Sequence, residues 1–184
     1  MNESRRNETK MNGTGLNEID RNEKGIDHEI PFRRKEGRSD AQRMQIRGNA
    51  LPLLTFPQFE ESAWLCHGMT TRLGGISDDM WTSLNLSFTR GDEEAAVREN
   101  FRRVAAELGV QEDRFVFARQ THTTNVRVVT EADAGKGLTR PQDDVEVDGQ
   151  ITNVPGLVLS IFTADCVPLF FADPVHRAIG LSHS

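Results

Sequence analysis

The chain has 184 residues, a mass of 20.6 kDa and a net charge of −6 from 22 basic and 28 acidic side chains. This length fits one domain with a tail, and the acidic balance argues against binding nucleic acid through a general basic surface. The two cysteines, Cys66 and Cys166, exclude a disulfide-rich secreted scaffold. Because no apolar stretch resembles a signal peptide or a membrane span, we expect a soluble cytoplasmic protein with no membrane partner.

The N-terminal part of the chain has its own pattern. Asn recurs every five residues, and Glu follows it in four of the five units; the asparagines are Asn2, Asn7, Asn12, Asn17 and Asn22. A period of five matches neither a helix nor a strand, and the segment has few apolar residues to bury. We therefore predict a disordered polar tail over residues 1–48 and a folded domain over residues 49–184.

The first elements of the predicted domain lead to its clearest helix. A strand is expected over 64–71, followed by a Gly-Gly turn and an irregular segment over 76–91. Asp92 is a candidate helix N-cap, and Gly109 is placed to end the helix. One face of that helix is apolar; it comprises Val97, Phe101, Val104, Ala105 and Leu108.

The rest of the domain is dominated by strands. Apolar runs predict strands over 115–118, 126–130, 147–152, 157–163, 169–172 and 178–181. A long loop with glycine and proline is expected over 131–144. Strands with one strong helix indicate an α+β or mixed α/β fold.

Three residues that can bind a metal are expected at strand ends. Cys166 follows an apolar strand, His122 lies just past another, and His183 ends a third. Two imidazoles and one thiolate suit an open Zn²⁺ site with a free fourth position. The separations follow no local spacing rule, so spacing alone favours an ordinary buried cysteine and two ordinary histidines.

The same residues also fit a thiol enzyme. Cys166 could act as nucleophile and His183 as its base, with Asp165 or Gln120 to orient or polarise. Multi-copper chemistry is disfavoured because it needs more histidine ligands than the sequence offers.

A second candidate site surrounds Arg72. This arginine precedes Gly74 and Gly75, which allow close approach of a ligand to the backbone. Its guanidinium suits a phosphate or a carboxylate. The simpler interpretation is a glycine turn beside a surface arginine.

Together, these segments resemble one bacterial family. The matching motifs appear in order at 71–77, 83–86, 91–103, 120–122, 147–152, 163–168 and 183–184. They resemble the purine nucleoside phosphorylases formerly called multicopper polyphenol oxidases or laccase-domain proteins, also described as peptidoglycan editing factors. The resemblance covers residues 51–184.

The resemblance implies a layered, mixed-sheet α/β sandwich with a metal held by His122, Cys166 and His183, which would also be the catalytic residues. Zinc is the implied metal, and copper is the alternative under the older name. The implied reaction converts adenosine, inosine or guanosine and phosphate into the base and ribose 1-phosphate, with adenosine deaminase and methylthioadenosine phosphorylase activities alongside. From residue type, we assign Arg72 to phosphate and Asn85 to the nucleoside.

The chain departs from the family pattern at both ends. The polar tail is not part of that pattern, and the family motif that includes His183 normally continues beyond the position of Ser184. We therefore expect a domain that is incomplete at its C-terminus. Two further hypotheses stay open, namely a cysteine-dependent hydrolase or amidase that edits peptidoglycan precursors, and an inactive fragment.

Overall fold

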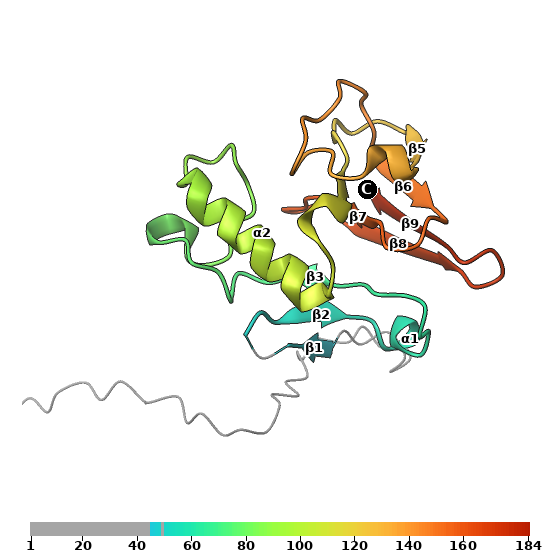
Figure 1. The fold of residues 1–184 in the computed structure, drawn as a ribbon, viewed down its shortest axis with the longest axis horizontal. Coiled ribbons are helices and arrows are strands. Elements are labelled where there is room, and N and C mark those ends of the chain that lie inside the picture. Colours follow the sequence, from blue (N-terminus) through green and yellow to red (C-terminus); the bar gives the residue numbers. More distant parts are fainter. Residues whose placement is uncertain (1–44, 49) are drawn as a thin grey trace, which may run out of the picture.

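The computed structural model describes residues 45–48 and 50–184 (Figure 1). The predicted tail lies outside the described residues as far as position 44. Residues 45–47 were predicted to belong to the disordered tail, but Gln45–Arg47 forms strand β1. This strand pairs antiparallel with β2 (Leu53–Thr55), which also pairs with β3 (Met69–Thr70) in a three-stranded sheet. The folded part of the chain therefore includes residues that we assigned to the tail.

The region before the main helix has less regular structure than predicted. The strand expected over 64–71 is reduced to β3, since only two of its residues pair with β2. A short helix, α1 (Pro57–Glu60), precedes it and was not predicted. A 3₁₀ turn, η2 (Asp79–Trp81), interrupts the irregular segment.

The predicted helix is confirmed as α2 (Glu94–Leu108). It ends at Gly109, whose φ of 69° lies in the left-handed region that glycine adopts without strain. Its start differs from the prediction: the N-cap residue is Glu93, one position after Asp92. The Asp92 carboxylate instead accepts hydrogen bonds from Ser77 Oγ and Asn85 Nδ2.

The apolar face of α2 forms one side of the larger hydrophobic core. Val97, Phe101, Val104 and Ala105 are all buried, as the periodicity predicts. They cluster with residues of β2 and of strand β4 (Phe115–Phe117); these are Leu53, Phe115 and Phe117.

Strand β4 separates two hydrophobic clusters. It pairs in parallel with β7 (Val158–Ser160). Phe115 and Phe117 face the α2 cluster, whereas Val116 joins a second cluster with Leu159 and Leu181. This alternation places the small parallel sheet between the helix and the larger sheet, in a layered arrangement.

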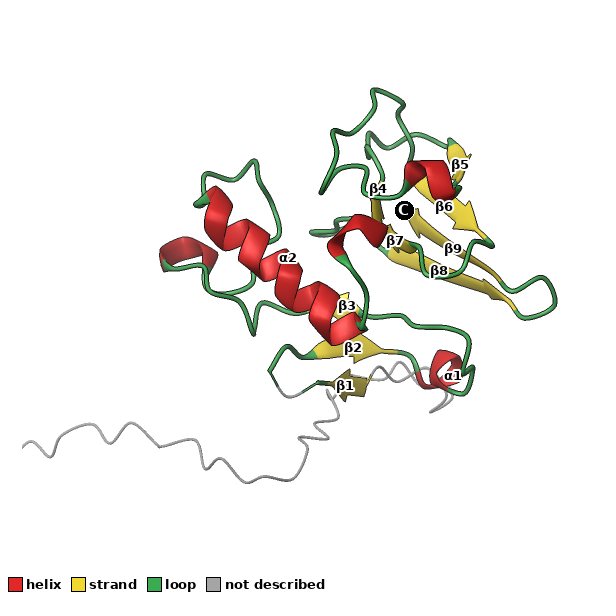
Figure 2. Cartoon of the chain, viewed as in Figure 1, coloured by secondary structure: helices red, strands yellow, loops and turns green. Residues whose placement is uncertain are grey.

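The third sheet has four strands in the order β5-β6-β9-β8 (Figure 2). Its strands are β5 (Val126–Val128), β6 (Gly149–Thr152), β8 (Pro168–Asp173) and β9 (Ala178–His183). Strands β5 and β6 are parallel, and the other two pairs are antiparallel. The predicted strands over 169–172 and 178–181 are confirmed and extend further in the structure.

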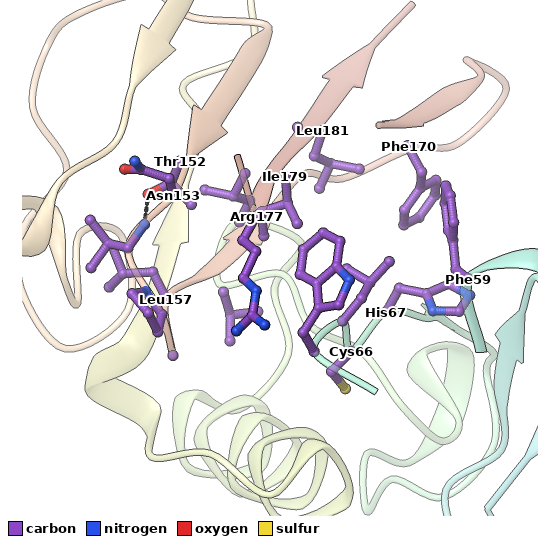
Figure 3. Close-up of a pocket in the computed structure, with 18 of the residues that line it drawn as sticks. Phe59, Cys66, His67, Thr152, Asn153, Leu157, Phe170, Arg177, Ile179 and Leu181 are labelled. Carbon is purple, nitrogen blue, oxygen red and sulfur yellow. Dashed lines mark hydrogen bonds between the residues drawn. The ribbon is translucent and has the colours of Figure 1, made fainter. Parts of the chain in front are cut away.

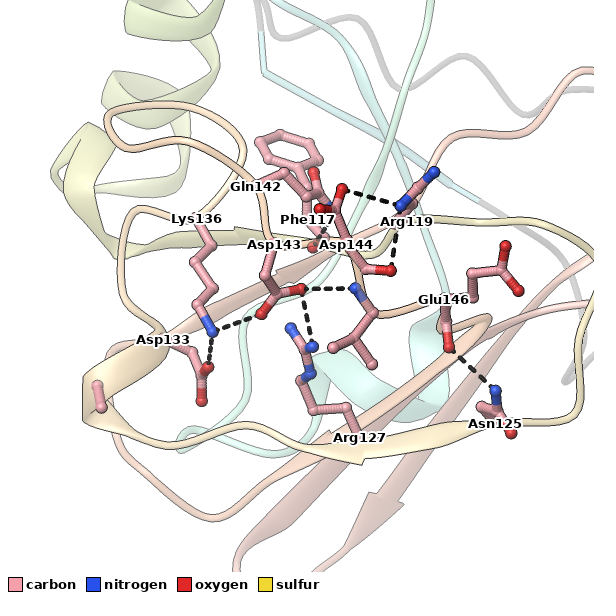
Figure 4. A network of polar contacts seen from close by, with 12 residues as sticks. Phe117, Arg119, Asn125, Arg127, Asp133, Lys136, Gln142, Asp143, Asp144 and Glu146 are labelled. Carbon is pink, nitrogen blue, oxygen red and sulfur yellow. Dashed lines mark hydrogen bonds and ion pairs between the residues drawn. The ribbon is translucent and has the colours of Figure 1, made fainter.

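The long connection between β5 and β6 is held against the sheet by charged side chains (Figure 4). Its first residues form a 3₁₀ turn, η4 (Glu131–Asp133). Lys136 Nζ contacts Asp133 Oδ1 at 2.6 Å and Asp143 Oδ2 at 2.8 Å. Arg127 of β5 contacts Asp143 Oδ1 at 2.9 Å. These contacts fix the path of the chain into β6.

Several short sheets and few helices confirm the expected α+β class. The remaining helical turn, η3 (Glu112–Arg114), leads from α2 into β4. Within the described ranges, every helix is too short or too polar to cross a membrane.

Candidate metal centre

Four strand ends meet at one edge of the four-stranded sheet. Pro168 at the start of β8 pairs with His183 at the end of β9. Gly149 at the start of β6 pairs with Ser182 of β9 and with Val126 of β5. This register brings together the segments that immediately precede β5, β6 and β8, so residues far apart in the sequence become neighbours.

The three predicted ligands gather at this edge. His122, Cys166 and His183 each offer one ligand atom, and these atoms lie within 4.8 Å of one another. Cys166 Sγ is 3.8 Å from His122 Nε2, and the ring centroids of His122 and His183 are 4.9 Å apart. A tetrahedral zinc ion holds such atoms about 3.5 Å apart, so a small contraction closes the site. The donor set and its spacing therefore fit a metal ion.

Asp148 is an acidic residue that contacts this cluster and was not among the predicted site residues. Its side chain is 3% exposed, and its Oδ1 lies 2.8 Å from His183 Nδ1. Burial raises the pKa of Asp148, but hydrogen bonds from the backbone of Thr123 and Thr121, from the His183 ring and from the backbone of His122 outweigh this effect and lower the pKa to about 2. Because the ionised carboxylate only accepts hydrogen bonds, His183 Nδ1 carries the proton and Nε2 remains for a metal.

Gln120 fixes the two segments that carry His122 and Cys166. Its Nε2 donates to the Phe162 carbonyl, and its Oε1 accepts the Phe162 N–H, both at 2.7 Å. These bonds occupy backbone groups that a longer strand would use, and β7 accordingly ends at Ser160 instead of continuing to residue 163. The carboxylate that contacts His183 is that of Asp148, and not of Asp165, while Gln120 is bound to Phe162.

The site is open on one side. His122 is exposed and Cys166 is half-buried, whereas the His183 side chain is only 7% exposed. A structural zinc site is closed by four protein ligands, but a catalytic site keeps one position for water or substrate. Among the described residues, three converging donors with an exposed histidine would leave one coordination position free.

The two residues assigned to substrate lie in the segment before α2, outside this cluster. Arg72 Nη2 donates to the carbonyls of Met80 and Thr82. Asn85 Nδ2 donates to Ser87 O and Asp92 Oδ2, and its Oδ1 accepts the Ser87 N–H. Both side chains therefore help to shape their own loop.

A separate apolar cavity lies between the 59–68 segment and the sheet (Figure 3). Its volume is about 430 Å³, and Arg177 reaches into it near Leu157 and Ile179. Its lining, within the part of the chain that the structure describes, does not include the three candidate ligands. This cavity is therefore not the space in front of the metal centre.

Comparison with known proteins identifies the family. Residues 66–184 match the family model described as multi-copper polyphenol oxidoreductase laccase. The chain belongs to this family. The expectation drawn from the order of the motifs is thereby confirmed.

Similar proteins carry a more specific name. The chain is 38% identical over 118 residues to the purine nucleoside phosphorylase YlmD of Bacillus subtilis, which aligns 64% of this chain with 42% of that protein. It is 39% identical over 134 residues to a purine nucleoside phosphorylase of Deinococcus radiodurans, covering 73% of this chain and 47% of the relative. The chain therefore spans less than half the length of these relatives.

Solved structures support the fold. The crystal structure of YlmD from Geobacillus stearothermophilus superposes with a TM-score of 0.65 at 34% identity, covering 76% of this chain and 52% of that one. A Bacillus licheniformis protein, YfiH, superposes with a TM-score of 0.59 at 32% identity and covers 80% and 51% of the two chains.

Proposed function

We propose that the protein is a zinc-dependent purine nucleoside phosphorylase, with His122, Cys166 and His183 as the metal ligands. The observation that carries the proposal is the convergence of these three donors at one sheet edge, in a chain similar to proteins named purine nucleoside phosphorylases. The substrates would be adenosine, inosine or guanosine with phosphate. Adenosine deamination and methylthioadenosine cleavage belong to the same proposal.

The residues of this chain would prepare the site before a substrate arrives. Asp148 accepts the Nδ1–H of His183, so that in the neutral ring Nε2 is the nitrogen left to bind a metal. Cys166 would bind as the thiolate, and a reducing cytoplasm would keep it available. A bound zinc ion would supply Lewis-acid chemistry.

Arg72 is the proposed phosphate-binding residue. Its Nη2 contacts two backbone carbonyls, but a guanidinium has five N–H donors, and the side chain is exposed. Replacing Arg72 by Ala should raise the KM for phosphate and leave the zinc content unchanged. Asn85 would contact a nucleoside only through Oδ1, because both of its N–H groups are already used.

One observation favours a second candidate, a cysteine hydrolase. The His183 ring is oriented by the Asp148 carboxylate and lies in the same cluster as Cys166, as a nucleophile–base–acid arrangement requires. This enzyme would need no metal. Chelators would leave it active, whereas they would inactivate a zinc phosphorylase.

The test compares the wild-type chain with matched cysteine variants. Metal content is measured by elemental mass spectrometry, and base release from each nucleoside is followed with and without phosphate. We expect one zinc per chain and phosphate-dependent release in the wild type and in Cys66→Ala, whose cysteine lies outside the cluster. Cys166→Ala should lose both. Full zinc content or full turnover in Cys166→Ala would refute the proposal.

A further inference from the structure

We propose that Asp148 is the positioning residue that holds both histidine ligands through one carboxylate, so that metal affinity depends on a group that is not itself a ligand. The inference rests on the proposed metal function. It assigns a role to Asp148, which lies in the 147–152 motif and was not among the predicted site residues.

Asp148 fixes His183 in two ways. Its carbonyl accepts the His183 backbone N–H at 2.8 Å, which continues the pairing of β6 with β9. Its carboxylate Oδ1 lies 2.8 Å from His183 Nδ1 and sets both the tautomer and the orientation of the ring. Backbone and ring are thus held by the same residue.

The same carboxylate fixes the segment that carries His122. It accepts three consecutive backbone N–H groups, from Thr121 at 3.0 Å, His122 at 3.1 Å and Thr123 at 2.9 Å. His122 has a φ of 61°, in the left-handed region that non-glycine residues rarely adopt. Three converging hydrogen bonds offset this conformational preference. Without them, the backbone would relax and carry the His122 ring away from Cys166.

One atom connects the two ligands. Asp148 Oδ1 accepts both the backbone N–H of His122 and the ring N–H of His183. Because the Asp148 side chain is buried, water cannot readily replace these bonds. A change at Asp148 should therefore disturb both histidines together, which is a larger effect than the loss of one ligand orientation.

The first experiment uses Asp148→Asn, which keeps the size of the side chain but replaces one acceptor oxygen by an N–H donor. We expect its dissociation constant for zinc, measured by competition with a chromogenic chelator, to rise about 10- to 100-fold. The matched control is Asp144→Asn, because Asp144 is exposed and pairs with Arg119. Its affinity should equal that of the wild type.

A second measurement separates positioning from general stability. Long-range ¹H–¹⁵N NMR of the metal-free wild-type chain should show His183 in the Nδ1–H tautomer alone, and Asp148→Asn should show a mixture. If Asp148 only stabilised the fold, its replacement by Asn would not change the tautomer of the His183 ring. Should Asp148→Asn fail to fold, the wild-type spectrum still decides, since mixed tautomers there would overturn the inference.

The outcomes distinguish the inference from the function on which it rests. A wild-type chain that binds no zinc refutes the proposed metal function, and the inference with it. A wild-type chain that binds zinc while Asp148→Asn binds it equally well refutes the inference alone. Weaker binding in Asp148→Asn, with the tautomer change, supports it.

Discussion

Asn100 is a buried amide on α2 that anchors the loop containing Arg72 and Asn85. It is 0% exposed. Its Oδ1 accepts the Ile76 N–H at 2.8 Å, and its Nδ2 donates to Ser77 Oγ at 2.9 Å and to the Asn85 carbonyl at 2.8 Å. Replacing Asn100 by Ala would remove these three bonds, together with a longer fourth bond to the Ser83 carbonyl at 3.4 Å, and leave their partners without the amide.

The expected loss in free energy of unfolding follows from these contacts. A buried partner left without its hydrogen bond loses about 1–3 kcal/mol, so three partners span about 3–9 kcal/mol. Two of the three bonds are only partly buried, which places the loss near the low end, at roughly 4 kcal/mol. Alanine favours the helix over asparagine by about 0.6 kcal/mol, which offsets part of the loss. We therefore expect Asn100→Ala to lower the free energy of unfolding by about 3 kcal/mol.

The assay is thermal unfolding followed by circular dichroism. A loss of this size should lower Tm by about 6–12 °C for a domain of this length. Arg102→Ala, on the exposed part of the same helix, serves as control and should change stability by less than about 0.5 kcal/mol. If Asn100→Ala is as stable as this control, the Asn100 amide does not hold the loop.

Three further predictions concern other polar side chains. Gln150 is buried and, among the described residues, its side-chain atoms have no hydrogen-bond partner, so Gln150→Leu should stabilise the protein by about 1–2 kcal/mol in urea unfolding. Hydrogen bonds from two cationic neighbours hold the pKa of Asp143 well below its ordinary 3.8, so its stabilising effect is present above that value and lost as pH falls; Tm should decrease less steeply below about pH 4 in Asp143→Asn. Gln120→Ala should accelerate hydrogen exchange at the Phe162 amide.

Each of these predictions has a contradicting result. Destabilisation by Gln150→Leu would mean that the amide has a hydrogen-bond partner in solution. Equal pH slopes for Asp143→Asn and the exposed-site variant Asp144→Asn would show that the ion pairs of Asp143 add nothing. The control is Gln111→Ala, because Gln111 is exposed. If the Phe162 amide exchanges equally fast in Gln120→Ala and in this control, the Gln120 contacts do not hold that segment.

Local patterns in the sequence were sufficient to predict α2 and the two strands β8 and β9, which form an antiparallel hairpin. The helix has its apolar face and its terminal glycine within a short stretch, and β8 and β9 are joined by a tight turn. Strand β2 was missed because three residues give too little periodicity. The strand predicted over 64–71 was too long, because the length of β3 depends on which residues of β2 are available for pairing.

The candidate site was only partly predictable for a similar reason. Their positions at strand ends made His122, Cys166 and His183 candidates, but spacing alone favoured ordinary residues, and the family resemblance selected them as ligands. The role of Asp148 was not visible, because its partners lie 25 to 35 positions away in the sequence. The internal hydrogen bonds of Asn85 were equally invisible, since residue type does not reveal which donors the fold already uses.

The most direct test of the central claim is X-ray absorption at the zinc edge on the purified chain. We predict two nitrogen ligands at about 2.0–2.1 Å and one sulfur at about 2.3 Å, corresponding to His122, His183 and Cys166. Cys166→Ala, which should lose the zinc, should give no zinc-edge signal above background, whereas Cys66→Ala should keep the sulfur shell. A zinc shell without sulfur in the wild type, or a wild-type chain without zinc, would contradict the account.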